Sequence, residues 1–226
     1  MTYDPGLYDD VLAGARDAST RAASLLDVAG LSGNVLEDAT TLADALAEAA
    51  EGVYGDRRTF SDALIVFLRF VAREGDPPAL DRAVRALLAE DAIDSDAGVD
   101  TVYRAGLVGA LSIVTVRRDY AARQDATAAR TAFSTVAEPV IEQTGDVLGY
   151  EAHAWLANLV GQAAIVLSRL AADRAPLVRV ETGLSMPATR LAYDLYGDPD
   201  RAAELVERNG VSTPCFMPVR LEALSS

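Results

Sequence analysis

The sequence contains no lysine, so all 20 of its basic side chains are arginine. A phosphate-binding loop of the Walker type needs a lysine, and so does Schiff-base catalysis on a carbonyl substrate. Both kinds of site are therefore excluded. The formal net charge of -14 also opposes generic binding to the phosphate backbone of nucleic acids, because such binding depends on cationic neutralisation.

Cysteine and histidine are almost as scarce, since Cys215 and His153 are the single residues of their types. One cysteine cannot form an intramolecular disulfide, and one cysteine with one histidine cannot supply a conventional zinc site. A catalytic triad would have to use His153 as its base, and no serine or cysteine nucleophile is recognisable beside it. We therefore expect no enzymatic activity, no metal and no cofactor.

The sequence also lacks long apolar runs. None approaches the roughly 20 consecutive apolar residues of a membrane-spanning helix. Residues 1–10 are polar and acidic, unlike a secretory signal peptide. We therefore expect synthesis in a cytoplasm and no association with membranes. The overall composition, 50% hydrophobic and 24% charged, is that of a folded globular protein.

Apolar residues recur at three- and four-residue intervals from about residue 6 to residue 174, and this part of the sequence is rich in alanine, leucine and arginine. The segments 65–69, 103–119 and 155–173 each contain Ile-Val followed by an arginine, and we interpret them as core helices of one bundle. Residues 1–175 are thus predicted to form a helical bundle. Its helices are expected near residues 7–29, 35–53, 60–74, 78–90, 99–121, 126–144 and 148–173.

Several helix ends can be assigned from single residues. Thr59 or Ser61 is expected to cap the third helix, and Asp76-Pro77-Pro78 is expected to form a corner, because proline suits a first helical turn. The acidic segment 89–100 has the Asp-x-Asp spacing of a calcium loop. Val99 and Ala105 stand where that loop needs glycine and glutamate, so a capping loop is expected instead.

The composition changes near residue 175, where "APLVRVET" is typical of a short strand. Ser185 is expected to cap a helix that ends at Gly197, and Asp198 to cap a second helix that ends at Asn209-Gly210. "MPVRLEAL" can return as a second strand. The predicted fold class is mainly α: a multi-helix bundle followed by a small α+β module, strand-helix-helix-strand, over residues 176–226.

The most specific motif lies in "LAYDLYGDPDRAAELVERNG", residues 191–210, and in the turn after it. This segment resembles the LysM-type module and, more closely, the C-terminal end of the DNA circularisation proteins of Mu-like phages. Weaker similarity extends over 103–114 and 126–173, so nearly the whole chain resembles the helical C-terminal half of that family and not its N-terminal domain. The matching residues are Leu195, Tyr196, Gly197, Asp198, Arg201, Ala202, Glu204, Leu205, Val206, Asn209, Pro214, Phe216 and Pro218.

The resemblance implies a non-enzymatic structural protein of a contractile phage or prophage-derived tail, near the baseplate hub or the tube end. Its implied partners are other tail and baseplate proteins, and its implied location is the bacterial host cytoplasm during assembly and then the virion tail. Tail proteins repeat around an axis, so a homo-oligomer is among the expected states. The family name implies a second role in holding the ends of injected DNA, and the LysM likeness implies peptidoglycan binding.

Two sets of candidate residues follow. Arg57-Arg58 and Arg117-Arg118 are the basic doublets that could contact DNA, although the acidic total favours surface ion pairs. Tyr193, Leu195, Tyr196 and Leu205 could line a glycan groove, but a small module needs such residues for its core. The candidates for interface or scaffold roles are Tyr193, Leu195, Tyr196, Gly197, Asp198, Arg201, Leu205, Asn209, Gly210 and Phe216.

Overall fold

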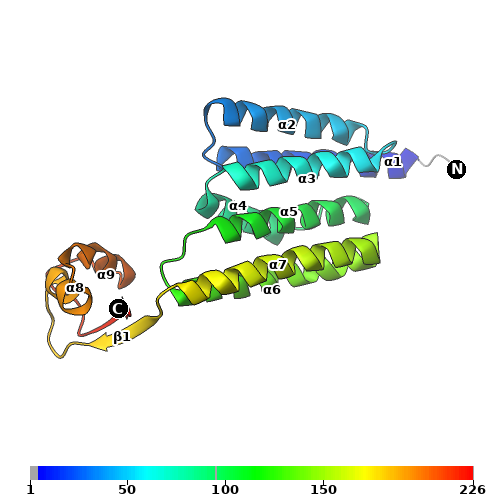
Figure 1. Ribbon diagram of the computed structural model, residues 1–226. Coiled ribbons are helices and arrows are strands. Elements are labelled where there is room, and N and C mark those ends of the chain that lie inside the picture. Colours follow the sequence, from blue (N-terminus) through cyan, green and yellow to red (C-terminus); the bar gives the residue numbers. More distant parts are fainter. Residues whose placement is uncertain (1–4, 95, 226) are drawn as a thin grey trace. The chain divides into compact units, whose positions relative to one another are not determined.

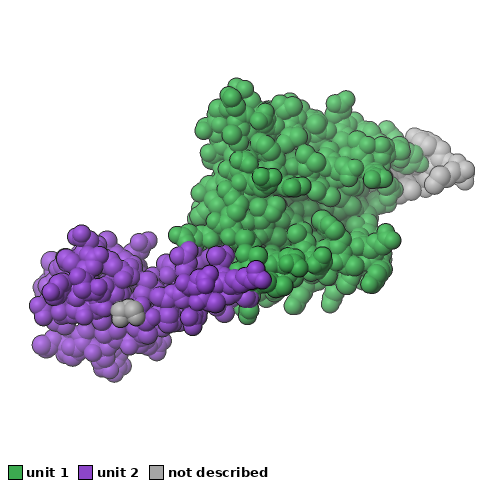
Figure 2. All heavy atoms as spheres, viewed as in Figure 1, with its two compact units in different colours: residues 1–119, 129–167 green, residues 120–128, 168–226 purple. Residues whose placement is uncertain are grey.

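The computed structural model describes residues 5–94 and 96–225. The protein is mainly helical, with 74% of residues in helices, and it has a small two-stranded antiparallel sheet near the C-terminus (Figure 1). The chain forms two compact units (Figure 2). We call residues 1–119 and 129–167 the bundle unit, and residues 120–128 and 168–226 the terminal unit.

The predicted helices of residues 1–175 are present, with bounds that differ by a few residues. The largest difference is at the first helix, which gives way after Ala23 to a short 3-10 turn, η1 (Ser24–Asp27), instead of continuing to residue 29. The α-helices are α1 (Pro5–Ala23), α2 (Gly33–Glu51), α3 (Arg57–Glu74), α4 (Pro77–Ala89), α5 (Ala97–Arg117), α6 (Arg123–Leu148) and α7 (Tyr150–Asp173).

The cap of α3 differs from the prediction. Helix α3 begins at Arg57, and the Asp56 carboxylate accepts hydrogen bonds from the backbone N–H groups of Arg58 and Thr59, each at 3.1 Å. Thr59 and Ser61 therefore lie inside the helix, so the prediction that one of them is the cap was wrong. The reason is that an aspartate directly before the first turn satisfies two free N–H groups at once.

Two other predicted helix starts are confirmed. The Asp76 carboxylate accepts a hydrogen bond from Ala79 N at 3.0 Å, with Pro77 in the first turn of α4. In the acidic segment, Asp96 accepts a hydrogen bond from Gly98 N at 2.8 Å and caps α5. Both loops thus act as helix caps, as the sequence predicted.

Helix α5 is the central element of the bundle unit, and its side chains are buried on almost every side. It packs against α1, α3 and α4 (Figure 1). A polar group also joins it to α6: the buried Asp100 carboxylate accepts hydrogen bonds from Arg104 Nε, Gln143 Nε2 and Ile93 N, each at 3.0 Å. Because both carboxylate oxygens accept hydrogen bonds and Arg104 carries the opposite charge, this buried charge is compensated.

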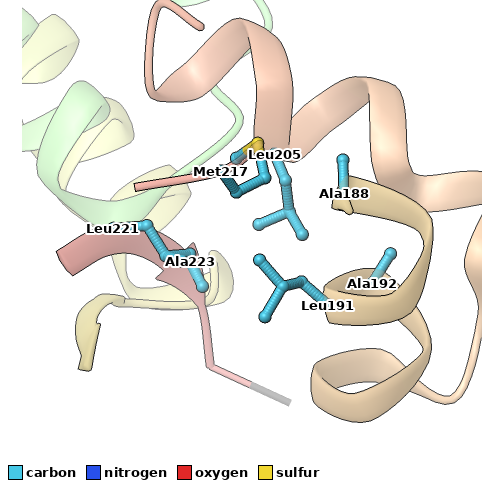
Figure 3. Packing of buried hydrophobic residues seen from close by; sticks show 7 residues of the cluster. All are labelled: Ala188, Leu191, Ala192, Leu205, Met217, Leu221 and Ala223. Atoms are coloured by element: carbon cyan, nitrogen blue, oxygen red, sulfur yellow. The ribbon is translucent and has the colours of Figure 1, made fainter. Parts of the chain in front are cut away.

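The sheet of the terminal unit pairs β1 (Leu177–Glu181) with β2 (Arg220–Leu224), with Leu177 opposite Leu224 and Glu181 opposite Arg220. Between the strands lie α8 (Ala188–Tyr196), the 3-10 turn η2 (Pro199–Arg201) and α9 (Ala202–Arg208). The strand-helix-helix-strand order is therefore present. Figure 3 shows the small apolar core that these elements share, formed by Ala188, Leu191, Ala192, Leu205, Met217, Leu221 and Ala223.

Ser185 does not cap α8, contrary to the prediction. The helix begins at Ala188, directly after Pro187, and the Ser185 hydroxyl donates a hydrogen bond to the Met217 carbonyl at 2.8 Å. Ser185 therefore ties the segment before α8 to the segment before β2. The predicted start of this helix was correct to within two residues. The hydroxyl of Ser185, however, bonds to a residue 32 positions away along the chain.

Candidate functional site

The corner between α8 and η2 is built by Gly197 and Asp198. Gly197 has φ of +71°, the left-handed conformation that glycine adopts at little cost, and its N–H donates to the Tyr193 carbonyl at 2.8 Å. Asp198 then accepts a hydrogen bond from Asp200 N at 2.9 Å and caps η2. Both candidates therefore have local structural roles.

Tyr196 and Arg201 form the second part of this corner. The Tyr196 hydroxyl accepts a hydrogen bond from the Leu224 N–H at 3.0 Å, which fastens α8 to the end of β2. The Arg201 guanidinium lies over the Tyr196 ring, 3.7 Å from its centroid, and also donates to Glu204 at 2.8 Å. A cation over an aromatic face is a favourable contact. Both side chains are thus occupied within the unit.

Asn209 joins α9 to β2 through its side-chain amide. Its Nδ2 donates to the Glu222 carbonyl at 2.9 Å and its Oδ1 accepts from the Glu222 N–H at 2.8 Å, so the amide pairs with both backbone groups of Glu222. Asn209 has φ of -94°, whereas Gly210 has φ of +60° and supplies the left-handed turn. The two residues that were predicted together as a helix end therefore have different roles.

Gln124 does the same at the other strand. Its Oε1 accepts from the Leu177 N–H at 2.8 Å and its Nε2 donates to the Leu177 carbonyl at 3.2 Å. Side-chain amides thus satisfy backbone groups on β1 and on β2, which a two-stranded sheet would otherwise expose. Sequence reasoning missed Gln124, because 53 residues separate it from Leu177 and no local pattern marks the pairing.

The remaining candidates of the terminal unit divide between core and surface. Leu205 is fully buried in the apolar core (Figure 3). Leu195 packs against that core while partly exposed. Tyr193 and Phe216 lie at the surface instead, with 58% and 71% of their areas exposed. Because exposed large aromatic side chains are typical of interaction sites, these two residues are the strongest candidates for contact with a partner.

The terminal unit also has a groove with a volume of about 440 Å³. Its walls are mainly apolar and come from the start of α8, from α9 and from the turn that contains Pro214 and Cys215. The apolar part of the wall includes Ala188, Ala202 and Val206. Among the described residues that line the groove, Glu207 is the one with a carboxylate. Neither Tyr193 nor Phe216 is among those lining residues.

The four arginine candidates have intramolecular partners. Arg117 donates to the carbonyls of Ala72 and Gly75 at 2.6 and 3.0 Å, and Arg118 pairs with the buried carboxylate of Asp81 at 3.0 Å. Arg117 thus satisfies carbonyl groups at the C-terminal end of α3, and Arg118 neutralises the buried charge of Asp81. Their side chains are therefore used in holding the bundle unit together.

Arg57 and Arg58 lie at the start of α3, beside a groove of about 290 Å³. Arg57 pairs with Asp96 at 3.3 Å, whereas Arg58 is 91% exposed and pairs loosely with Asp62 at 3.7 Å. The pKa of Asp56 lies below its usual value, chiefly because the Thr59 hydroxyl donates a hydrogen bond to its carboxylate. A second hydrogen bond, from the Thr59 backbone N–H, lowers the pKa further. Carboxylates therefore surround this doublet.

Sequence reasoning also missed the outer face of α7. We interpreted residues 155–173 as a core helix, but Trp155 is 53% exposed and Ile165 is 47% exposed. Trp155 also borders a groove of about 230 Å³ whose floor includes Gly106 and Gly109 of α5. Residues 152–168 include no charged residue, in a chain where 24% are charged, and an uncharged run of this kind predicts burial on all sides.

Within residues 5–94 and 96–225, two helices are long and apolar enough to span a membrane by length and composition. In α5, 67% of the apolar window is buried inside the protein, as expected for a core helix. In α7 only 28% of the window is buried. The apolar composition of α7 is therefore not explained by packing inside the bundle unit alone.

Among the described residues, no cluster of three or more His, Cys, Asp or Glu side chains could hold a metal ion. Comparisons with known proteins add no further guide. No protein-family model matches the chain, and no curated protein matches it.

Proposed function

We propose that this protein is a non-enzymatic structural component of a contractile phage or prophage-derived tail, located near the baseplate hub or the tube end. It acts through contacts with other tail and baseplate proteins. It is made in the bacterial host cytoplasm and then becomes part of the virion tail. The terminal unit, with its LysM-like strand-helix-helix-strand order, is its docking element.

The observation that carries this proposal is that most residues of the motif stabilise the fold of the terminal unit, while two aromatic residues remain exposed. Gly197, Asp198, Tyr196 and Asn209 all have intramolecular roles, as a turn, a cap, an anchor to β2 and a clamp on β2. A motif of this kind marks a fold and needs no reaction chemistry. What it presents outward is Phe216, together with Tyr193 on the exposed side of α8.

The physical properties of the terminal unit suit docking. Its own apolar core and its backbone clamps make a pre-formed shape, so little conformational entropy is lost when a partner binds. Aromatic side chains that are already exposed and held on a short helix or turn give contact area at low entropic cost. These features support binding to a protein surface.

The test is assembly of tails in the bacterium that carries the gene. Removal of 176–226 would also strip Gln124 of its partner Leu177, so point variants are sharper. We expect Tyr193→Ala and Phe216→Ala to leave the purified protein folded, as judged by circular dichroism, and to reduce the yield of complete tails. Asp200→Ala is the matched control, because Asp200 is exposed on the same unit. Normal yields from the double aromatic variant would refute the docking role.

A second candidate is glycan binding, favoured by the groove of about 440 Å³ in the LysM-like unit. Its apolar wall is poor in hydrogen-bonding groups, which sugars require, so this candidate ranks below protein docking. A sedimentation assay with purified peptidoglycan separates the two. Retention of the wild-type chain and loss of retention in Ala203→Glu, which adds charge to the groove wall, would favour the glycan.

A further inference from the structure

Helix α7 presents a second ordered face to the outside of the bundle unit. Its inner face is buried through Leu156, Val160, Ala163 and Leu167. The opposite face is exposed at Glu151, Trp155, Asn158, Gln162 and Ile165. We call these five residues, with Arg169, the outer seam; Arg169 lies on the same continuous helix, where α7 extends into the terminal unit.

The spacing of the outer seam is regular. Its residues follow one another at intervals of four, three, four, three and four, which is the 3.5-residue repeat of helices that pair side by side. A repeat of this kind keeps one stripe facing a partner helix over several turns. The members of this stripe are exposed in the described part of the chain, with Trp155 at 53% and Ile165 at 47%.

The outer seam is uncharged along its middle and carries opposite charges at its two ends. The chain as a whole has a formal net charge of -14, so most of its surface would repel a second copy. Residues 152–168 contain no charged residue, and Glu151 and Arg169 stand at the two ends of that run with opposite signs. Two copies can therefore meet along α7 without the repulsion that opposes association elsewhere.

We propose that a second copy of this chain docks on the outer seam, with the two α7 helices antiparallel. In this arrangement Glu151 faces the partner's Arg169, Trp155 faces the partner's Ile165, and Asn158 faces the partner's Gln162. Each pair occurs twice by symmetry. A parallel arrangement would place Glu151 against Glu151 and Arg169 against Arg169, so the charges select the antiparallel one.

Each layer of the proposed interface has matching chemistry. The two amides at the centre can exchange hydrogen bonds and fix the register, as polar residues do inside paired helices. Trp155 and Ile165 bury apolar surface on either side, and the groove of about 230 Å³ beside Trp155 has room for the partner's Ile165. The opposite charges then lie at the rim. This inference does not depend on the proposed tail function.

The first test is the mass of the full chain in solution, measured by sedimentation equilibrium over a range of concentrations. We expect a monomer-dimer equilibrium, and we expect Trp155→Glu to weaken it by about 30-fold or more, since a buried tryptophan often dominates an interface. Leu36→Glu is the matched control: Leu36 is an exposed apolar residue on α2, and its variant should dimerise normally. Circular dichroism checks that each variant is folded.

The second test exchanges the charges and does not depend on the tryptophan. Glu151→Arg places arginine against arginine twice, and we expect it to weaken the dimer by about three- to tenfold at low salt. The double variant Glu151→Arg/Arg169→Glu restores opposite charges, so its dissociation constant should return to within about twofold of the wild-type value. Restoration by the second substitution is specific to the antiparallel pairing.

Three results would overturn the inference. A chain that stays monomeric at the highest attainable concentration has no such interface. A dimer that Trp155→Glu leaves unchanged is formed by another surface. A monomeric chain that floats with neutral phosphatidylcholine vesicles, and stops doing so in Trp155→Glu, uses the outer seam for a lipid surface instead. None of these results bears on tail assembly through Tyr193 and Phe216.

Discussion

Side-chain amides on two residues hold the sheet of the terminal unit. Gln124 pairs with the backbone of Leu177 in β1, and Asn209 pairs with the backbone of Glu222 in β2. A two-stranded sheet is marginally stable alone, so these hydrogen bonds and the apolar core together keep it folded. The sequence predicted Asn209 as a helix end, but it held no sign of a partner 13 residues away.

This role gives a prediction for Asn209. Asn209→Ala removes both hydrogen bonds and leaves two backbone groups of Glu222 unpaired, so we expect the free energy of unfolding of the terminal unit to fall by about 1–3 kcal/mol. Amide hydrogen exchange at Glu222 measures the loss locally. Glu222→Ala is the control: it keeps the backbone groups that Asn209 binds and should change stability by less than about 0.5 kcal/mol. Equal losses in the two variants would contradict the clamp.

The cap of α3 predicts a pH dependence at single-residue scale. The pKa of Asp56 lies below its ordinary value of 3.8 in the folded protein, chiefly because Thr59 donates hydrogen bonds to its charged form. A depressed carboxyl pKa stabilises the fold above the unfolded-state pKa, and this contribution is lost as the pH falls through the folded-state pKa. The relevant window is therefore at and below about pH 3.8.

Asp56→Asn tests that dependence, because asparagine also caps helices but carries no charge. We expect the wild-type chain to have the higher midpoint of thermal unfolding at neutral pH, since a negative charge suits the start of a helix. The difference should shrink as the solution is acidified below about pH 3.8. A difference that stays constant through this range would mean that the charge of Asp56 does not stabilise α3.

At the scale of elements, local chemistry predicted the helices well. Pro77 begins a helix and Gly197 ends one through the conformation of their own backbone, so both helix ends can be predicted from the neighbouring sequence. Ser185 and Arg117 could not be assigned in this way, because Met217 and Ala72, which they contact, are far along the chain. The exposure of Trp155 was missed for a different reason: apolar periodicity predicts a helix, but it does not show which of the helix's faces is buried.

Helix α5 crosses α3 closely at Gly106. A methyl group on Gly106 would lie 2.9 Å from the Cδ1 atom of the buried Leu68, whereas one on Gly109 would meet Leu159 at an ordinary 3.8 Å. We expect Gly106→Ala to destabilise the bundle unit by about 1–3 kcal/mol through overpacking. Gly109→Ala should instead stabilise it by about 0.5–1 kcal/mol through helix propensity.

Chemical denaturation followed by circular dichroism distinguishes these two variants. They make the same substitution three residues apart on one helix, so helix propensity alone would shift both in the same direction. Opposite shifts are expected, because only Gly106 lies at the crossing with α3. If both variants were stabilised to the same degree, the close approach of α3 and α5 would be contradicted.

For the whole molecule, charge argues against DNA binding. The net charge is -14, and Arg57, Arg117 and Arg118 are engaged by carboxylates or carbonyls within the bundle unit. We expect no retardation of duplex DNA in an electrophoretic mobility assay at low salt, the condition that favours cationic contacts most. A retarded band that weakens in Arg57→Ala/Arg58→Ala would instead support binding at that doublet.

The proposed tail function is tested most directly by the composition of the particle. Contractile tails purified from the bacterium that carries the gene would be analysed by quantitative mass spectrometry, with gold-labelled antibody to locate the chain by electron microscopy. We predict that the chain is present in a fixed ratio to the other baseplate proteins and that the label lies at the baseplate end. Complete, infectious particles that lack the chain would contradict the proposal.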